Sequence, residues 1–452
     1  MKKNILEKAI EMPAKLLEGT VEAAAKATGA IPGVSRMKAY WHTLGPGLTT
    51  GAADDDPSGI ATYSQAGAKY GFQFLWLAVL TFPLMSLVQE MCARIGLATG
   101  KGLAANIRQH FPKPILYTCT ILLFIANTFN IGADLGAMAQ AMQLVLPDIP
   151  FAVFVIGFAL LSIGLQIFTP YAQYAKYLKW LALVLLSYIV SALLIDLNWS
   201  EIAIHAVIPT ITFSKDQILL VCAVLGTTIS PYLFFWQTSQ EVEERILQGK
   251  TTIKQRRQTT PEDIKNMRTD VWSGMFLSNL VMFFIIAVCG AVLMKNGITD
   301  ITTSAQAAEA LRPLAGNATY LLFVIGIVGT GLLAIPVLAG SSSYALSESF
   351  HWKMGLYHKL KEAYSFYGII IISMLAGLAM NFIGLDPIKA LISSAVMNGL
   401  IAPIVLVLIV MLSSNKKVMA KWTNHTVTTV LGWLIVIIMT MVGLAAIVAL
   451  TF

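Results

Sequence analysis

Long apolar segments constrain this chain more than any other feature of its sequence. Stretches such as 151–167, 276–294 and 430–452 contain no charged residue, and they approach the roughly 20 apolar residues that a membrane-spanning helix needs. Only 12% of the 452 residues are charged, about half of the roughly 25% that soluble domains carry. The sequence therefore predicts an all-α polytopic membrane protein that lies in a lipid bilayer.

The basic residues indicate how the chain crosses the bilayer. They gather in six clusters between the apolar stretches, and cytoplasmic loops are the ones enriched in Lys and Arg. If all six clusters are cytoplasmic, an even number of spans separates each neighbouring pair. This parity predicts eleven transmembrane helices, at residues 44–67, 72–93, 114–143, 150–169, 178–196, 217–242, 271–294, 318–347, 365–384, 388–413 and 428–451.

The basic clusters also predict the location and the partners of the protein. Residues 1–43 would form a cytoplasmic N-terminal tail, and the single span after the last cluster would leave the C-terminus outside the cytoplasm. The net charge of +7 is explained by cytoplasmic loops of a cell-membrane protein, so we expect no nucleic-acid partner. No segment indicates an obligate protein partner.

The first predicted span is unusual because it reads 51-GAADDDPSGIATYSQAGA-68. Hydropathy alone would make it a loop, but parity places it across the membrane. Asp54, Asp55 and Asp56 cannot face lipid, so they should line a protein-enclosed or water-filled site. Pro57 removes a backbone N–H, and the Asp-Pro-Ser-Gly run cannot continue a regular helix. The stretch predicts a broken helix, unwound over that run, with an ion site.

A second interruption lies in the sixth span, which reads 226-GTTISPYLFFWQ-237. Transporters built from inverted repeats bind substrate between two interrupted helices that occupy matching positions in the two halves. Four spans separate the two interruptions here, which resembles the LeuT-type fold of five plus five helices. We therefore expect a first repeat at 44–196, a second repeat at 217–413, and an additional helix at 428–452.

Two segments carry a resemblance to a known family. The run 45-GPGLTTGAADDDPSGIATYSQAGAKYGFQFLW-76 is similar to the first helix of Nramp metal transporters, whose signature is Asp-Pro-Gly-Asn followed by Ala-Thr and Gln-Ala-Gly. The second span, 89-QEMCARIGLATGKGLA-104, resembles the family's Ala-Arg-x-Gly-x-x-Thr-Gly-Lys segment. The resemblance extends over nearly the whole chain and implies a divalent metal ion as the transported substrate, with no cofactor.

The departures from the family pattern concern the implied metal ligands. The resemblance implies that the family's Asp, Asn, Met and Ala carbonyl correspond to Asp56, Gly59, Ser230 and Thr227. The Asp is kept, whereas the Asn and the Met are replaced. This altered pattern resembles the Nramp-related magnesium transporters.

The replacement of Met matters because a thioether is a soft ligand, and its loss removes discrimination against Mg²⁺. Mg²⁺ usually keeps several of its waters, so a gap at Gly59 would suit a hydrated ion. Asp56 would supply charge, Ser230 and Thr227 hard oxygens, and Ala53 a carbonyl. The possible outer-shell or pathway residues are Asp55, Asp54, Asn130, Asp134, Tyr232, Gln237, Gln89 and Asn398. For the last two, hydrogen bonding between helices is at least as good an interpretation.

The Nramp resemblance implies proton coupling through histidines of helix six, carboxylates of helices three and four, and arginines of helix nine. Here Tyr232 and Gln237 occupy the histidine-like positions, 150–169 has no ionisable residue, and 365–384 has no Lys or Arg. We therefore expect Mg²⁺ and Mn²⁺ uptake without proton coupling. The main alternative is an H⁺-coupled Mn²⁺/Fe²⁺ symporter, and Na⁺-coupled solute uptake or a metal-responsive receptor are weaker ones. The sequence shows no nucleophile–base set that would indicate an enzyme.

Overall fold

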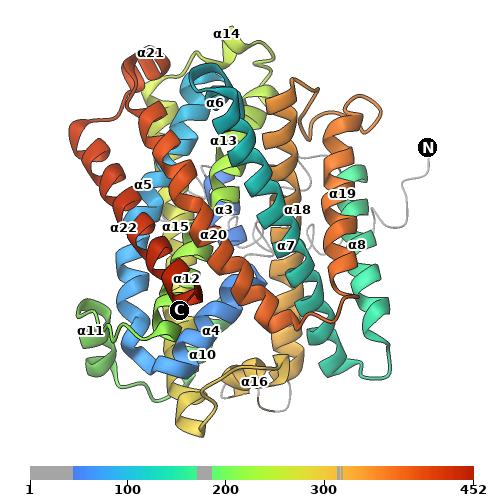
Figure 1. Cartoon of the computed structure of the whole chain (residues 1–452), viewed down its shortest axis with the longest axis vertical. Helices are drawn as coiled ribbons and strands as arrows, with labels where there is room; N and C mark the ends of the chain where they lie inside the picture. The colour runs from blue at the N-terminus through green and yellow to red at the C-terminus, as the bar shows by residue number, and fades with distance from the viewer. Residues whose placement is uncertain (1–43, 170–185, 313–315, 317–318, 452) are drawn as a thin grey trace, which may run out of the picture. The chain divides into compact units, whose positions relative to one another are not determined.

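Helices and loops make up all of the chain that the computed structural model describes, namely residues 44–169, 186–312, 316 and 319–451 (Figure 1). The longer helices are α3 (Pro46–Asp54), α4 (Pro57–Tyr70), α5 (Leu75–Thr99), α7 (Lys113–Val145), α8 (Phe151–Phe168), α12 (Lys215–Thr228), α13 (Pro231–Leu247), α15 (Pro261–Val292), α18 (Thr319–Phe350), α19 (Tyr364–Met380), α20 (Pro387–Ser413) and α22 (Thr426–Thr451). The shorter ones are η1 (Gly71–Phe74), α6 (Leu103–His110), α10 (Leu186–Leu194), α11 (Trp199–Val207), α14 (Ile253–Arg256), η3 (Met294–Asn296), α16 (Ser304–Ala308), η4 (Glu309–Leu311), α21 (Lys416–Met419) and η6 (Ala420–Trp422).

Eight helical stretches in the described residues are long and apolar enough to cross a membrane, and α19 is a shorter apolar helix. One stretch, Pro57–Thr99, has 43 residues, and a straight helix of that length would measure roughly 65 Å, about twice the hydrocarbon thickness. Gly71, at φ 60°, begins the 3₁₀ turn η1 and divides the stretch into α4 and α5. The two spans predicted at 44–67 and 72–93 are therefore separate helices.

The other predicted spans also overlap helices, although one of them is described only in part. For the span at 178–196 the structure describes only the last part, in which α10 (Leu186–Leu194) is helical, and residues 178–185 lie outside the described residues. Helices α8 and α22 lie at opposite sides of the view in Figure 1. Both expose large apolar side chains, such as Leu160 and Val430. Such exposed apolar surface is expected where lipid replaces water.

The two interrupted helices lie inside the bundle. Helix α15 packs against α3, α4 and α5, helix α12 packs against α20 and α22, and helix α13 packs against α5 and α18. Glycines permit the closest of these contacts, because a Cβ at Gly51 would overlap the backbone of Gly274, and one at Gly226 would overlap Ala395 and Gly399. The ends of both interrupted helices are thereby enclosed by protein.

Segments from three of the basic clusters share one end of the bundle. Figure 1 shows α6, α14 and α21 at that end, with α11 and α16 at the other. Helices α6, α14 and α21 carry Arg108, Arg256 and Lys416, among other basic residues. This common location agrees with the parity argument, which requires the basic clusters to face the same side of the membrane.

Candidate functional site

The first interruption is shorter than the sequence predicts and lies earlier in the chain. Helix α3 ends at Asp54, Asp55 and Asp56 are not helical, and α4 begins at Pro57. The prediction that Asp-Pro-Ser-Gly is unwound was therefore wrong for its last three residues, which form the first turn of α4. Proline fits the first position of a helix, where the missing N–H would have no intrahelical partner. Likewise, Ala53 lies in the last turn of α3 rather than in an unwound turn.

Asp56 caps the second half of this broken helix. Its Oδ1 accepts hydrogen bonds from the Gly59 backbone N–H and the Ser58 hydroxyl, both at 2.7 Å. Its Oδ2 accepts from Asn130 Nδ2 of α7 at 2.9 Å, and the same amide group donates to Asp134 at 3.0 Å. The carboxylate is fully buried, and the positive end of the α4 dipole stabilises its charge. Asn130 is thus a hydrogen-bond donor to both Asp56 and Asp134.

The carboxylates of Asp54 and Asp56 face different helices. Asp54 accepts a hydrogen bond from the Ser278 hydroxyl of α15 at 2.6 Å, whereas Asp56 faces Asn130 of α7. Neither oxygen of Asp55 has a hydrogen-bond partner in the described part of the chain, although the side chain is fully buried. Among the residues that the structure describes, no three His, Cys, Asp or Glu side chains are placed to share one metal ion. A metal here would need hydroxyl, carbonyl or water oxygens as well.

The second interruption supplies such oxygens. Helix α12 ends at Thr228, Ile229 and Ser230 are not helical, and α13 begins at Pro231. The Ser230 hydroxyl points back to α12, where it lies 2.6 Å from the Gly226 carbonyl and 2.7 Å from the Thr227 carbonyl. Thr227 Oγ1 is buried and has no hydrogen-bond partner within the described residues. A hydroxyl and a backbone carbonyl, both predicted as ligands, therefore lie together.

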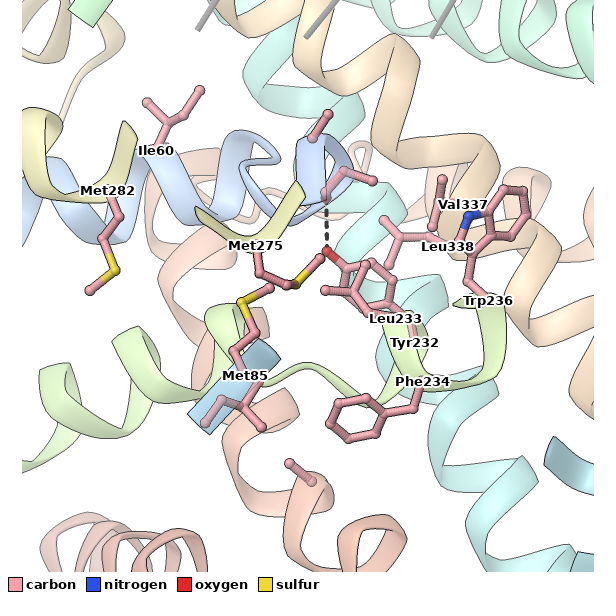
Figure 2. Packing of buried hydrophobic residues seen from close by; sticks show 14 of the residues in the cluster. Ile60, Met85, Tyr232, Leu233, Phe234, Trp236, Met275, Met282, Val337 and Leu338 are labelled. Atoms are coloured by element: carbon pink, nitrogen blue, oxygen red, sulfur yellow. Dashed lines mark hydrogen bonds between the residues drawn. The ribbon is translucent and has the colours of Figure 1, made fainter. Parts of the chain in front are cut away.

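Two tyrosines join the interruptions to each other. The Tyr232 hydroxyl of α13 donates to the Ala53 carbonyl of α3 at 3.0 Å, and Figure 2 shows this bond, with the ring surrounded by buried apolar side chains such as Met275 and Leu338. The Tyr63 hydroxyl of α4 lies 3.1 Å from Thr228 Oγ1 of α12. Each half of the first broken helix is thus bonded to a half of the second.

Gly59 is a position of close approach between the two broken helices. A Cβ at this residue would lie 3.1 Å from the Asp54 carbonyl oxygen and 3.2 Å from Thr227 Oγ1, which is closer than ordinary van der Waals contact. The structure therefore does not leave the open gap that the sequence predicted at Gly59. Its lack of a side chain instead brings the first turn of α4 against Thr227.

Three predicted pathway residues form no hydrogen bond with either interruption in the described part of the chain. Gln237 donates to Glu241 at 3.0 Å along α13, and Gln89 of α5 and Asn398 of α20 are buried. No hydrogen bond within the described residues connects any of the three to either interruption.

The sequence reasoning missed Ser278 and Tyr63. Tyr63 follows Asp56 by seven residues, a spacing that places two side chains on one helix face, so it could have been found. Ser278 stands beside Asn279 in an apolar span, and no sequence pattern distinguishes which of the two faces the site.

Carboxylate, hydroxyl and carbonyl oxygens are the ligands that suit Mg²⁺, Ca²⁺ and Mn²⁺. Asp56 and the Ala53 carbonyl provide such oxygens at the first interruption, and Thr227 and Ser230 provide them at the second. The hydrogen bond from Tyr232 to Ala53 joins the two interruptions. Oxygen ligands of this kind are the ones that a hard divalent cation would need in the interior of a membrane protein.

Comparisons with known proteins bear on the family and the fold of this chain. Residues 47–449 match the family model described as natural resistance-associated macrophage protein-like, or Nramp. A protein named divalent metal cation transporter MntH, from Klebsiella pneumoniae (strain 342), is 28% identical over 404 residues, which cover 87% of this chain and 91% of that protein.

Two solved structures show the same fold. The manganese transporter of Eremococcus coleocola has a TM-score of 0.71 at 19% identity, covering 91% of this chain and 87% of its own. Mhp1, a nucleobase-cation-symport-1 family transporter, has a TM-score of 0.55 at 13% identity, covering 90% and 91%. The LeuT-type fold with two broken helices, predicted from the two interruptions, is therefore confirmed.

Proposed function

We propose that this chain, which belongs to the Nramp family, transports Mg²⁺ and Mn²⁺ across the cell membrane as a secondary transporter. Its relatives include proteins named as divalent metal cation and manganese transporters. This similarity supports divalent metal ions as the transported substrates. The fold and the relatives are those of a multi-pass membrane transporter and not of an enzyme. The choice of Mg²⁺ and Mn²⁺ comes from the oxygen ligands at the two interruptions.

The observation that carries the proposal is the position of Ser230. This residue stands where the Nramp pattern has Met, and its hydroxyl lies 2.7 Å from the Thr227 carbonyl. An oxygen ligand set with no thioether at this position has no preference for soft transition metals. Mg²⁺ binds through one or two carboxylates and keeps several waters, and Asp56 provides the carboxylate. Mn²⁺ binds to the same kinds of ligand, so the same site would also transport Mn²⁺.

We further propose that this transport is not coupled to protons. The polar chain that leads from Asp56 passes through Asn130 to Asp134, and an amide is a poor proton carrier because it has no titratable group. Tyr232, in the histidine-like position, donates a hydrogen bond to the Ala53 carbonyl. The driving force would be the ion gradient and the membrane potential, which contributes about 2.3 kcal/mol per charge per 100 mV, or roughly 4.6 kcal/mol for a divalent ion.

The orientation that we propose places the N-terminus in the cytoplasm and the C-terminus outside it. This proposal is supported by α6, α14 and α21, which carry basic residues and lie at one end of the bundle. Cytoplasmic loops are the ones enriched in such residues. Cysteine labelling of an introduced Cys in α21 from each side of intact cells would test the assignment.

Flux into proteoliposomes tests the function. We expect purified protein to carry Mn²⁺ into vesicles, Mg²⁺ to compete with it, and an internal pH dye to stay constant while the metal enters. Acidification that grows with the Mg²⁺ or Mn²⁺ concentration would support the H⁺-coupled symporter instead. Vesicles that take up no divalent ion would contradict the proposal as a whole.

A further inference from the structure

The buried negative charge around the first interruption is unevenly supplied with hydrogen-bond donors. On the α7 side, Asp56 and Asp134 share the Asn130 amide, and Asp56 also accepts from Ser58 and Gly59. On the α15 side, Asp54 accepts from a single hydroxyl, that of Ser278. In the chain, Asp55 lies between Asp54 and Asp56.

Asp55 is the carboxylate that accepts no hydrogen bond of good geometry in the described structure, because the Ser278 hydroxyl, which also lies near it, donates to Asp54. Both of its oxygens are buried without a hydrogen bond, and no Lys, Arg or His within the described residues forms an ion pair with it. An ionised carboxylate buried in a membrane protein without donors or a counter-charge is unstable by several kcal/mol. Charged residues at membrane depth normally pair with each other or line an ion path. A cation is therefore the partner that the site lacks.

A second buried oxygen without a partner in the described chain belongs to the other interruption. Thr227 Oγ1, at the end of α12, is buried and has no partner in the described residues. This hydroxyl lies close to Gly59, and so does the backbone carbonyl oxygen of Asp54. Asp54 immediately precedes Asp55 in the chain. The two interruptions thus each present an oxygen without a protein partner.

We propose that Asp55 binds the transported cation directly, as a second carboxylate beside Asp56, and that this pair makes the site selective for divalent over monovalent ions. The inference rests on the proposed function and assigns to Asp55 a role that the sequence alone gives to Asp56. Asp56 needs no metal to be stabilised, because three donors and a helix N-terminus already face it. Asp55 is stabilised only when the ion is bound.

The consequence for selectivity follows from charge. Two adjacent carboxylates neutralise one divalent ion, whereas a monovalent ion would leave a net negative charge buried in the membrane. Coordination of Mg²⁺ by one or two carboxylates with retained waters agrees with this pair.

The test is the thermal unfolding of the purified full-length protein with and without MnCl₂ or MgCl₂. In Asp55→Asn the metal-free protein should unfold at no lower a temperature than the wild type, because the replaced carboxyl has no hydrogen bond or ion pair in the described structure to lose. The metal-induced rise in unfolding temperature should be lost, and the affinity for Mn²⁺ should fall on the order of 10-fold to 100-fold. Asp55→Glu, which keeps the charge, should retain the metal-induced rise.

Glu90→Gln is the matched control. Glu90 is also a buried acid of a membrane helix, but it accepts hydrogen bonds from Arg268 at 2.8 Å and Trp272 at 2.9 Å. Neutralising it should lower the unfolding temperature of the metal-free protein and leave the metal-induced rise unchanged. A loss of stability in Glu90→Gln and none in Asp55→Asn would separate a paired carboxylate from an unpaired one.

The outcomes also separate this inference from the proposed function. If the wild type transports Mn²⁺ and Asp55→Asn binds it with unchanged affinity, Asp55 is not a ligand and the proposed function stands. A wild type that neither binds nor transports divalent ions removes both. If Asp55→Asn does not fold, an Asp55→Glu protein without the metal-induced rise overturns the inference on its own.

Discussion

Both broken helices restart at a proline after two non-helical residues. Asp55 and Asp56 precede Pro57 of α4, and Ile229 and Ser230 precede Pro231 of α13. The residue before each proline has an extended backbone, with ψ of 173° at Asp56 and 134° at Ser230, as the ring of the following proline requires. The side chains of these two residues nevertheless point in opposite directions along the chain.

Hydrogen-bond chemistry explains the difference. An ionised Asp can only accept, so Asp56 turns forward to the N–H of Gly59 at the start of α4. Ser can donate, so Ser230 turns back to the carbonyls of Gly226 and Thr227 at the end of α12. The first interruption therefore holds a charge at a helix N-terminus, and the second presents neutral oxygens. An ion between them would find its electrostatic partner on one side and neutral ligands on the other.

The largest effect should come from Asp56→Asn. Asn is as good an N-cap as Asp, so the variant removes the charge and keeps the cap. We expect Mn²⁺ uptake into proteoliposomes to fall at least on the order of 100-fold, the upper end of the loss when an outer-shell partner is removed. The unfolding temperature should fall only slightly, because the Asn amide nitrogen cannot accept the hydrogen bond from Asn130. Ser230→Ala, the matched change at the uncharged interruption, should lower uptake far less. Equal losses of Mn²⁺ uptake in the two variants would show that the charged and the neutral interruption contribute equally to transport.

Substitution of Gly59 tests how close the two interruptions need to be. Gly59→Ala places a Cβ 3.1 Å from the Asp54 carbonyl oxygen and 3.2 Å from Thr227 Oγ1, and such overpacking destabilises by about 1–3 kcal/mol. We expect several-fold slower transport and a lower unfolding temperature. Gly157→Ala in α8 is the control, because a Cβ there meets nothing within 4 Å and should stabilise the helix by about 0.5–1 kcal/mol. A Gly59→Ala protein as stable and active as Gly157→Ala would show that the contact has no role.

Ser230→Met sharpens the comparison at the second interruption. A thioether in place of the hydroxyl should favour Mn²⁺ over Mg²⁺, by about 10-fold, or roughly 1.4 kcal/mol. The measurement is inhibition of Mn²⁺ uptake by increasing Mg²⁺. Ser230→Leu has a side chain of similar bulk without sulfur, so it should lose activity and gain no selectivity. If both variants select alike, Ser230 does not face the ion.

The smallest effect should come from Tyr232→Phe. This change removes the hydroxyl that donates to the Ala53 carbonyl and keeps the ring in its apolar surroundings, so we expect a loss of about 0.5–1.5 kcal/mol in unfolding free energy. Tyr63→Phe removes the other bond between the interruptions and should act similarly. The double variant tests whether the two bonds act together, because a loss smaller than the sum of the single losses would show that each bond depends on the other.

Much of this architecture follows from local properties of the chain. The length of the apolar segments predicts the membrane helices, the parity of the basic clusters predicts that 44–67 crosses the bilayer, and the prolines predict both interruptions. The limits of the first interruption were predicted less well, because Pro57 both ends a preceding helix and begins a following one. Sequence alone does not distinguish between these two effects.

The directions of the three aspartates were decided by tertiary structure. Asn130, which faces Asp56, is 74 residues away, and Ser278, which faces Asp54, is 224 residues away. The position of Thr227 against Gly59 likewise depends on the packing of α4 and α12. By itself the sequence determined that acidic residues must enter the membrane at a broken helix, because hydropathy and proline act locally. Which acid is left without a donor was decided by helices far away in the chain, because only their packing places donors beside a buried carboxylate.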